Sequence, residues 1–424
     1  MVQKDSSHTG AVQEGPEAPL KRLWLATSGD RNDSFTTWPV VKGGVVYASS
    51  GPGVLAAEAG TGRRLWFYRP PEGQKQVAPA VDDRALYLPL PRSQVVALDR
   101  VSGAELWRAR TEESSLLDPS PTLAGGRLYL GLPKPRSVYA LDAASGRLIW
   151  KAPTELEPSS VPAVARGIVV LATEDLNSPR AHILALDAAT GREIWRLESR
   201  EGVSSPSIAS QTVIIGGGDG FAHALDLETG RSIWRSPTED VFGVKTFPAI
   251  AFGDVFLADR VGNLYRLDGR TGKRKWILRD TVGTMDQSFP VIAGSTLFIG
   301  SGAGWVYAVD AGSGRVLWKE RVGGVVLSGA ADSKRFYFGV KLRNEGLYAY
   351  AHDPGEPAPP GGAGALLRTS FLLALILAAI LLARRRRAAR RHAERPKRII
   401  RHHARQQPIS LTRRQRAGRK AGPT

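Results

Sequence analysis

The sequence predicts an all-β protein, an eight-bladed β-propeller with four-stranded blades, closed by the N-terminal strand and followed by one C-terminal transmembrane helix. Three observations support this prediction. An acidic residue, a Gly four positions later and a Trp eight positions later recur seven times in the 424 residues. The copies are spaced by roughly 42 residues, a period typical of propeller blades. One continuous apolar segment, residues 366–383, lies near the C-terminus.

The clearest copy of the motif is ALDAATGREIW at residues 185–195. A short run of β-forming residues leads to the acid, whose carboxylate can accept backbone hydrogen bonds in the following turn. Gly suits the left-handed position of a hairpin turn, and one indole per unit predicts packing between neighbouring blades. The motif glycines are Gly62, Gly103, Gly146, Gly191, Gly230, Gly272 and Gly314, and the indoles are Trp66, Trp107, Trp150, Trp195, Trp234, Trp276 and Trp318. The acidic residues occur once per blade, which favours turn capping over metal ligation.

Three apolar runs precede the Trp strand in most units, such as 205–209, 212–217 and 222–226 in the fifth. Pro near the start of the first run suits a strand at an edge, here the innermost strand beside a central channel. The eighth unit has runs at 327–331, 335–340 and 347–351 but no Trp strand. The segment Leu20–Thr27 resembles an isolated Trp strand, so Trp24 is predicted to complete the eighth blade. Seven blades with loose ends is the alternative.

The remaining segments flank this predicted propeller at residues 20–353. Residues 1–19 are polar and read as a flexible lead-in. Residues 354–365 form a Pro/Gly linker, and the 366–383 segment is long enough to cross a bilayer as a helix. Residues 384–424 form a basic tail with a formal charge of +15, expected to be disordered, whereas the other 383 residues carry only +3.

Arg384, Arg385, Arg386 and Arg387 follow the apolar segment directly. Because positive flanks remain cytoplasmic, they predict a single-pass protein of the cell membrane with a cytoplasmic tail and an extracytoplasmic propeller. No export signal precedes the propeller. We therefore expect an export segment upstream of Met1; a tail-anchored protein with a cytosolic propeller is the alternative.

The pattern A-x-D-x-x-T-G-x-x-x-W, as in ALDAATGREIW and ALDLETGRSIW with RLDGRTGKRKW as a near variant, resembles the Trp-docking motif of quinoprotein (PQQ-type) propellers. The resemblance covers about Leu20 to Asp353 and implies an eight-bladed propeller. Members of that family include dehydrogenases that use pyrroloquinoline quinone and calcium, non-catalytic scaffolds such as the propeller lipoprotein of the outer-membrane barrel-assembly machinery, and sensor domains. The dehydrogenases stack the quinone on a vicinal disulfide, and this chain has no Cys.

The sequence therefore favours a non-catalytic protein- or ligand-binding scaffold without cofactor or metal, and with no catalytic residues. A quinone-dependent oxidoreductase with calcium is one alternative, and a ligand sensor signalling through the span is another. Lys245, Asp286 and Gln287 precede predicted inner strands and mark a possible binding site at the channel mouth. The expected partners are an unidentified protein and membrane lipids, the latter through the 366–383 helix and the basic tail. Nucleic acid is not expected, because no aromatic residue follows Phe371 to stack on bases.

Overall fold

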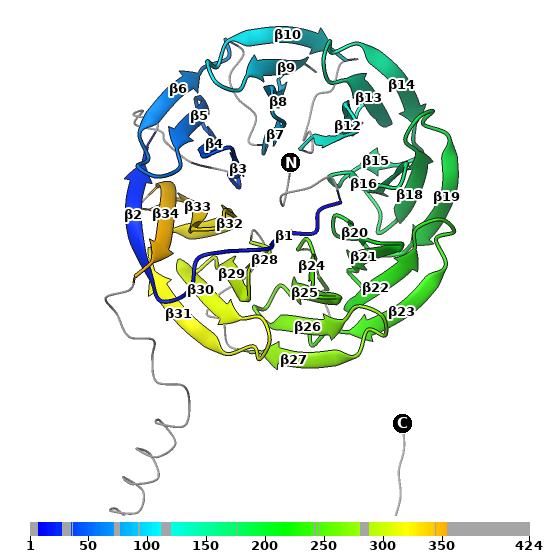
Figure 1. The fold of residues 1–424 in the computed structure, drawn as a ribbon. Helices are drawn as coiled ribbons and strands as arrows, with labels where there is room; N and C mark the ends of the chain where they lie inside the picture. The colour runs from blue at the N-terminus through cyan, green and yellow to red at the C-terminus, as the bar shows by residue number, and fades with distance from the viewer. Residues whose placement is uncertain are drawn as a thin grey trace, which may run out of the picture. The chain divides into compact units, whose positions relative to one another are not determined.

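The protein forms a closed ring of eight β-sheets in a computed structural model (Figure 1). The structure describes residues 7–27, 35, 37–71, 77–91, 94–111, 120–175, 177–240, 243–244, 246–279, 288–343 and 345–353. No helix long and apolar enough to span a membrane occurs among these residues. The linker 354–365, the predicted span 366–383 and the basic tail with Arg384–Arg387 lie outside the described residues, so those predictions stay untested.

Each blade consists of four strands numbered from the channel outward, and the sequence order matches the spatial order in the first seven blades. Blade 1 contains β3 (Val40–Lys42), β4 (Val45–Ser50), β5 (Gly53–Glu58) and β6 (Arg64–Tyr68), and blade 2 contains β7 (Ala80–Val81), β8 (Ala85–Leu90), β9 (Gln94–Asp99) and β10 (Glu105–Arg110). Blade 3 contains β11 (Thr122–Ala124), β12 (Arg127–Leu132), β13 (Ser137–Asp142) and β14 (Leu148–Pro153). Blade 4 contains β16 (Ala163–Ala165), β17 (Ile168–Glu174), β18 (Ala181–Asp187) and β19 (Glu193–Ser199), and the short β15 (Glu157–Pro158) also pairs with β17.

Blades 5 to 7 repeat the same arrangement. Blade 5 contains β20 (Ser207–Ala209), β21 (Thr212–Gly216), β22 (Phe221–Asp226) and β23 (Ser232–Pro237). Blade 6 contains β24 (Ala249–Ala251), β25 (Asp254–Ala258), β26 (Leu264–Asp268) and β27 (Arg274–Leu278). Blade 7 contains β28 (Val291–Ala293), β29 (Thr296–Gly300), β30 (Trp305–Asp310) and β31 (Val316–Arg321). Middle strands are almost wholly buried, whereas the outermost strands are mostly exposed or partly buried and bury their Trp in several blades. The core therefore lies between neighbouring blades.

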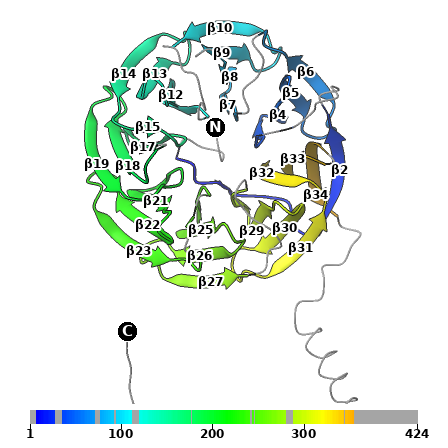
Figure 2. The ribbon, with the colours of Figure 1, turned by 180° about the vertical axis from the view of Figure 1, so that it is seen from behind.

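Both ends of the chain build the eighth blade. From the channel outward, its first three strands are β32 (Val325–Ala331), β33 (Arg335–Lys341) and β34 (Gly346–His352), and its outermost strand is β2 (Leu20–Ala26). β2 pairs antiparallel with β34, with Trp24 opposite Ala349. This confirms the predicted closure, and Figure 2 shows β2 beside β34 from the other side of the ring.

Residues 7–19, which we call the strap, lie against the innermost strands of the ring and precede β2 in the chain. Its strand β1 (Ala11–Val12) pairs parallel with β28, the innermost strand of blade 7 (Figure 1). His8 of the strap is fully buried. The expected flexible lead-in is therefore wrong for residues 7–19, because backbone hydrogen bonds hold a segment that has no apolar side-chain pattern.

Candidate binding site at the central channel

Seven interfaces between blades share one local contact, in which the indole of one blade docks on the hairpin of the next. Trp150, for example, donates from Nε1 to Ala188 O over 3.1 Å. Its ring covers Gly191, where an added Cβ would lie 2.6 Å from Trp150 Cε3. Gly191 has φ +74°, so only Gly fits both the backbone conformation and the contact. The seven docked pairs are Trp24–Gly62, Trp66–Gly103, Trp107–Gly146, Trp150–Gly191, Trp195–Gly230, Trp234–Gly272 and Trp276–Gly314.

The acid of each motif caps its own turn. Asp187 Oδ1 accepts from the N–H of Ala189 and Thr190 and from Thr190 Oγ1, at 3.1, 2.8 and 2.7 Å. The Thr190 hydroxyl and these N–H groups lower the pKa of Asp187. The prediction of turn capping agrees with this geometry. Among the described residues no group of three His, Cys, Asp or Glu is arranged to hold a metal ion.

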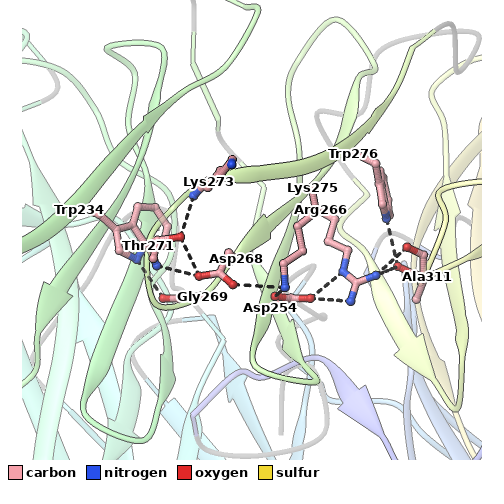
Figure 3. A network of polar contacts seen from close by, with 11 residues as sticks. Trp234, Asp254, Arg266, Asp268, Gly269, Thr271, Lys273, Lys275, Trp276 and Ala311 are labelled. Atoms are coloured by element: carbon pink, nitrogen blue, oxygen red, sulfur yellow. Dashed lines mark hydrogen bonds and ion pairs between the residues drawn. The ribbon is translucent and has the colours of Figure 1, made fainter.

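Blade 6 departs from this pattern through a network of charged side chains (Figure 3). Arg266 stands where the other blades have Ala, and it contacts Asp254 Oδ2 at 2.6 Å. The Asp254 side chain is 1% exposed, and its Oδ1 forms an ion pair with Lys275 Nζ at 2.5 Å. Lys275 Nζ also lies 3.3 Å from Asp268 Oδ2. Hydrogen bonds from Thr271 and Lys275 lower the pKa of Asp268 to about 2.

The same network connects blade 6 to blade 7. Arg266 Nη1 donates to Ala311 O at 3.1 Å and to Gly312 O at 2.6 Å. Ala311 O also accepts from Trp276 Nε1 at 3.1 Å (Figure 3). The guanidinium thus reinforces the dock at this interface.

Aromatic side chains from residues that precede the inner strands meet at the channel axis. Phe247 and Phe289 have ring centroids 4.7 Å apart, and Trp38 packs edge-on against them at 5.8 and 5.1 Å. Ala78 and Val161 complete this axial cluster. The predicted channel-mouth residues Lys245, Asp286 and Gln287 lie outside the described residues, immediately before segments that lead into this cluster.

The strap occupies the channel from the opposite direction. His8 packs against Phe247 with ring centroids 5.8 Å apart. Its Nδ1 lies 3.1 Å from Pro206 O, and its Nε2 lies 3.3 Å from Thr122 Oγ1. These contacts connect the strap to three blades, because Thr122 begins β11, Pro206 directly precedes β20 and Phe247 precedes β24. Side chains that precede the inner strands and a side chain of the strap therefore meet on the channel axis.

The strap binds the inner strands through its backbone carbonyls. The N–H groups of Ile208, Ile250 and Ile292 donate to Ser7 O, Thr9 O and Gly10 O at 2.7, 2.6 and 2.8 Å. These three isoleucines occupy the same position in blades 5, 6 and 7, opposite Val213, Val255 and Leu297. One arc of the channel mouth is thus covered by an extended chain.

A cavity of about 330 Å³ lies beside the strap, over blades 8, 1 and 2. Lys42 and Asp332 are the charged residues among those that line it; the other lining residues are apolar, Gly or Pro. The lining residues are Gly10, Ala11, Val12, Pro39, Val40, Val41, Lys42, Gly43, Gly44, Val81, Val291, Gly329, Ala330, Ala331 and Asp332. Sequence reasoning missed this site, although its inner strands were located, because the strap that forms one wall had no recognisable strand pattern.

A family model described as outer membrane protein assembly factor BamB matches residues 18–109, 91–181 and 179–326. These matches cover more than half of the chain. The chain belongs to this family. Membership in the BamB family confirms the resemblance to PQQ-type propellers that the repeat motif indicated. A search of curated proteins finds no match.

Solved structures with the same fold include BamB from Moraxella catarrhalis, with a TM-score of 0.64 and 16% identity over 78% of this chain and 100% of that one. A europium-containing methanol dehydrogenase has a TM-score of 0.66 and 15% identity over 83% of this chain and 97% of that one. The computationally designed Ika8 protein has a TM-score of 0.68 and 14% identity over 78% and 99%. At these identities the likeness establishes the fold, which BamB, an enzyme and a designed protein share.

Proposed function

We propose that this BamB-like propeller is a membrane-anchored, non-catalytic scaffold that binds a protein partner outside the cytoplasm. The observation that carries the proposal is the cluster of packed side chains on the channel axis. Trp38, Phe247 and Phe289 pack on the axis from one end, and His8 enters from the other. Because these side chains occupy part of the axis, we infer that a partner binds at the mouths or the rim of the propeller.

The proposed scaffold uses no cofactor. The residues of the chain do not fit pyrroloquinoline quinone in the way that the dehydrogenases hold it, because the chain has no Cys for a vicinal disulfide. Aromatic rings that could flank a quinone are instead packed against one another on the axis. We therefore derive no quinone chemistry for this chain.

Membrane attachment belongs to the same proposal. The apolar segment 366–383 would span the bilayer, Arg384–Arg387 would hold the tail on the cytoplasmic side, and the tail would contact anionic lipid. Proteolysis of intact cells tests this arrangement. The propeller is expected to be cleaved by added protease while the tail is protected, and the opposite pattern would refute the topology.

Purified full-length protein incubated with pyrroloquinoline quinone and Ca²⁺ tests the absence of catalysis. We expect neither saturable quinone binding nor reduction of an electron-accepting dye with alcohol or aldose substrates. Saturable binding together with turnover would replace the scaffold by an oxidoreductase.

A further inference from the structure

The eight inner strands present equivalent backbone N–H groups to the channel mouth. In each blade this N–H group belongs to the residue of the innermost strand that lies opposite the second residue of the next strand. Examples are Ile292, which lies opposite Leu297, and Val41, which lies opposite Val46. Val81 opposite Leu86 and Ala331 opposite Phe336 occupy the same position in blades 2 and 8. At these pairs the inner strand directs its N–H away from its own sheet, as the Ile292 bond to the strap demonstrates.

The strap uses three of these donors and leaves others free. Ile208, Ile250 and Ile292 donate to the strap, whereas no hydrogen bond to a residue outside the sheet is found for the N–H of Val41, Val81 or Ala331 among the described residues. The three free donors lie in the wall of the 330 Å³ cavity. An unpaired edge of this kind is a template for adding an extended chain.

The walls of the cavity indicate what kind of chain would fit. Nothing lies within 4 Å of a Cβ added at Gly44, and Ala330 carries only a methyl group, so another backbone can approach closely at these two positions. The lining is otherwise apolar, and the two charges, on Lys42 and Asp332, have opposite sign. A neutral segment with small side chains matches this surface, and the Gly10–Val12 stretch of the strap, which forms one wall, has that composition.

We propose that the arc of blades 8, 1 and 2 binds an extended, neutral, small-residue segment of a partner protein. The carbonyls of that segment accept hydrogen bonds from the N–H groups of Val41, Val81 and Ala331, as the strap carbonyls accept them on blades 5 to 7. The inference rests on the proposed scaffold function and specifies where the partner binds and which chemistry recognises it.

A Pro substitution removes one donor with little disturbance to the sheet, because Pro is tolerated on an edge strand where the N–H faces away from the neighbour. Val41→Pro removes a donor that faces the cavity. Leu123→Pro is the matched control, since Leu123 has the equivalent position in blade 3, opposite Leu128, and does not line the cavity. Thermal unfolding of both variants verifies that they fold.

The experiment selects heptapeptides from a phage-displayed library on the full-length protein in detergent, with counter-selection on Val41→Pro. We expect peptides rich in Gly, Ala and Val whose Kd, measured by fluorescence anisotropy, rises at least tenfold in Val41→Pro and is unchanged in Leu123→Pro. Hydrogen exchange should show slower exchange at Val41 and Val81 when peptide is bound, a measurement on the unaltered protein that holds even if Val41→Pro fails to fold.

Selection that yields no peptide, or peptides that bind the two Pro variants equally and leave exchange at Val41 unchanged, would overturn the site. Such a failure without quinone turnover removes only this site and leaves the scaffold proposal in place. Quinone turnover would remove the scaffold proposal, whatever the peptides do.

Discussion

Seven of the eight interfaces between blades rest on a hairpin, and the eighth rests on two chain ends. Trp150 meets a hairpin whose glycine makes room for the indole and whose carbonyl accepts its N–H. Trp318 faces blade 8, where the chain is open between β34 and β2. It packs against Tyr350 with ring centroids 5.5 Å apart, and no hydrogen bond from its Nε1 is found among the described residues.

The seam is otherwise an ordinary sheet. β2 pairs with β34 from Leu20 opposite His352 to Ala26 opposite Leu347, with a bulge at Arg22/Trp24 like the one beside each Trp in the other blades. Asp353 N donates to Pro19 O at 2.9 Å, and Lys21 forms an ion pair with Asp353 at 2.9 Å. Two strands can therefore pair without a hairpin that connects them. The indole of the preceding blade, in contrast, docks only where such a hairpin is present.

The largest difference between the two kinds of interface should appear when the indole is removed. We expect Trp150→Ala to lower the free energy of unfolding by about 3–5 kcal/mol, because it empties a buried, hydrogen-bonded site. Trp318→Ala should cost about half as much, since its indole is only partly buried and lacks the dock. Denaturant unfolding followed by circular dichroism measures both, and equal losses would abolish the distinction.

The hairpin glycine offers a finer comparison. Gly191→Ala should cost about 3 kcal/mol, of which about 1 kcal/mol is backbone strain at positive φ and the rest is overlap with Trp150. Gly125→Ala is its control, because Gly125 also has positive φ (+54°) but nothing lies within 4 Å of an added Cβ. It should cost about 1 kcal/mol. Similar losses in the two variants would show that the indole contact contributes nothing.

Acid should weaken the hairpins. The pKa of Asp187 is lowered by the Thr190 hydroxyl and backbone N–H groups, and that of Asp268 is lowered to about 2. Because the folded state holds these carboxylates ionised, their stabilisation is complete above the ordinary pKa of 3.8 and is lost as the pH falls toward 2. The denaturant midpoint should therefore decrease between pH 5 and pH 2. Asp187→Asn should show a smaller decrease than the unaltered protein, and an identical pH profile would contradict the capping role.

The smallest effect is expected for the ion pair at the seam. Lys21→Met should change the free energy of unfolding by no more than about 0.5 kcal/mol, since the Lys21 side chain is 52% exposed and water screens the pair. Unfolding at low and high salt measures it. A loss above 2 kcal/mol would mean that this pair, rather than strand pairing, holds the ring closed.

The sequence could predict features that rest on side-chain pattern. The missing Trp strand of the eighth unit and the orphan Leu20–Thr27 together indicated the closure that β2 and β34 confirm. The glycine and acid of each motif are determined by turn geometry within a few residues, so their roles were also readable.

Features that depend on backbone hydrogen bonds or on register could not be predicted in this way. The strap is polar in sequence and is held through carbonyls, which every residue possesses. Arg266 was visible only as a variant of the motif, because its partner Asp254 is 12 residues away and becomes its neighbour only through the pairing of β25 with β26. The predicted site at Lys245, Asp286 and Gln287 stays a prediction.

A ring of interchangeable units can fold with strands assigned to the wrong neighbour, since each sheet offers nearly the same surface. The charges of blade 6 oppose such an error. Arg266 and Lys275 find the carboxylate of Asp254 only when β25, β26 and β27 belong to one sheet, and any slipped assembly would bury a lone charge at high cost. We therefore expect blade 6 to be the sheet that least tolerates a strand from another blade.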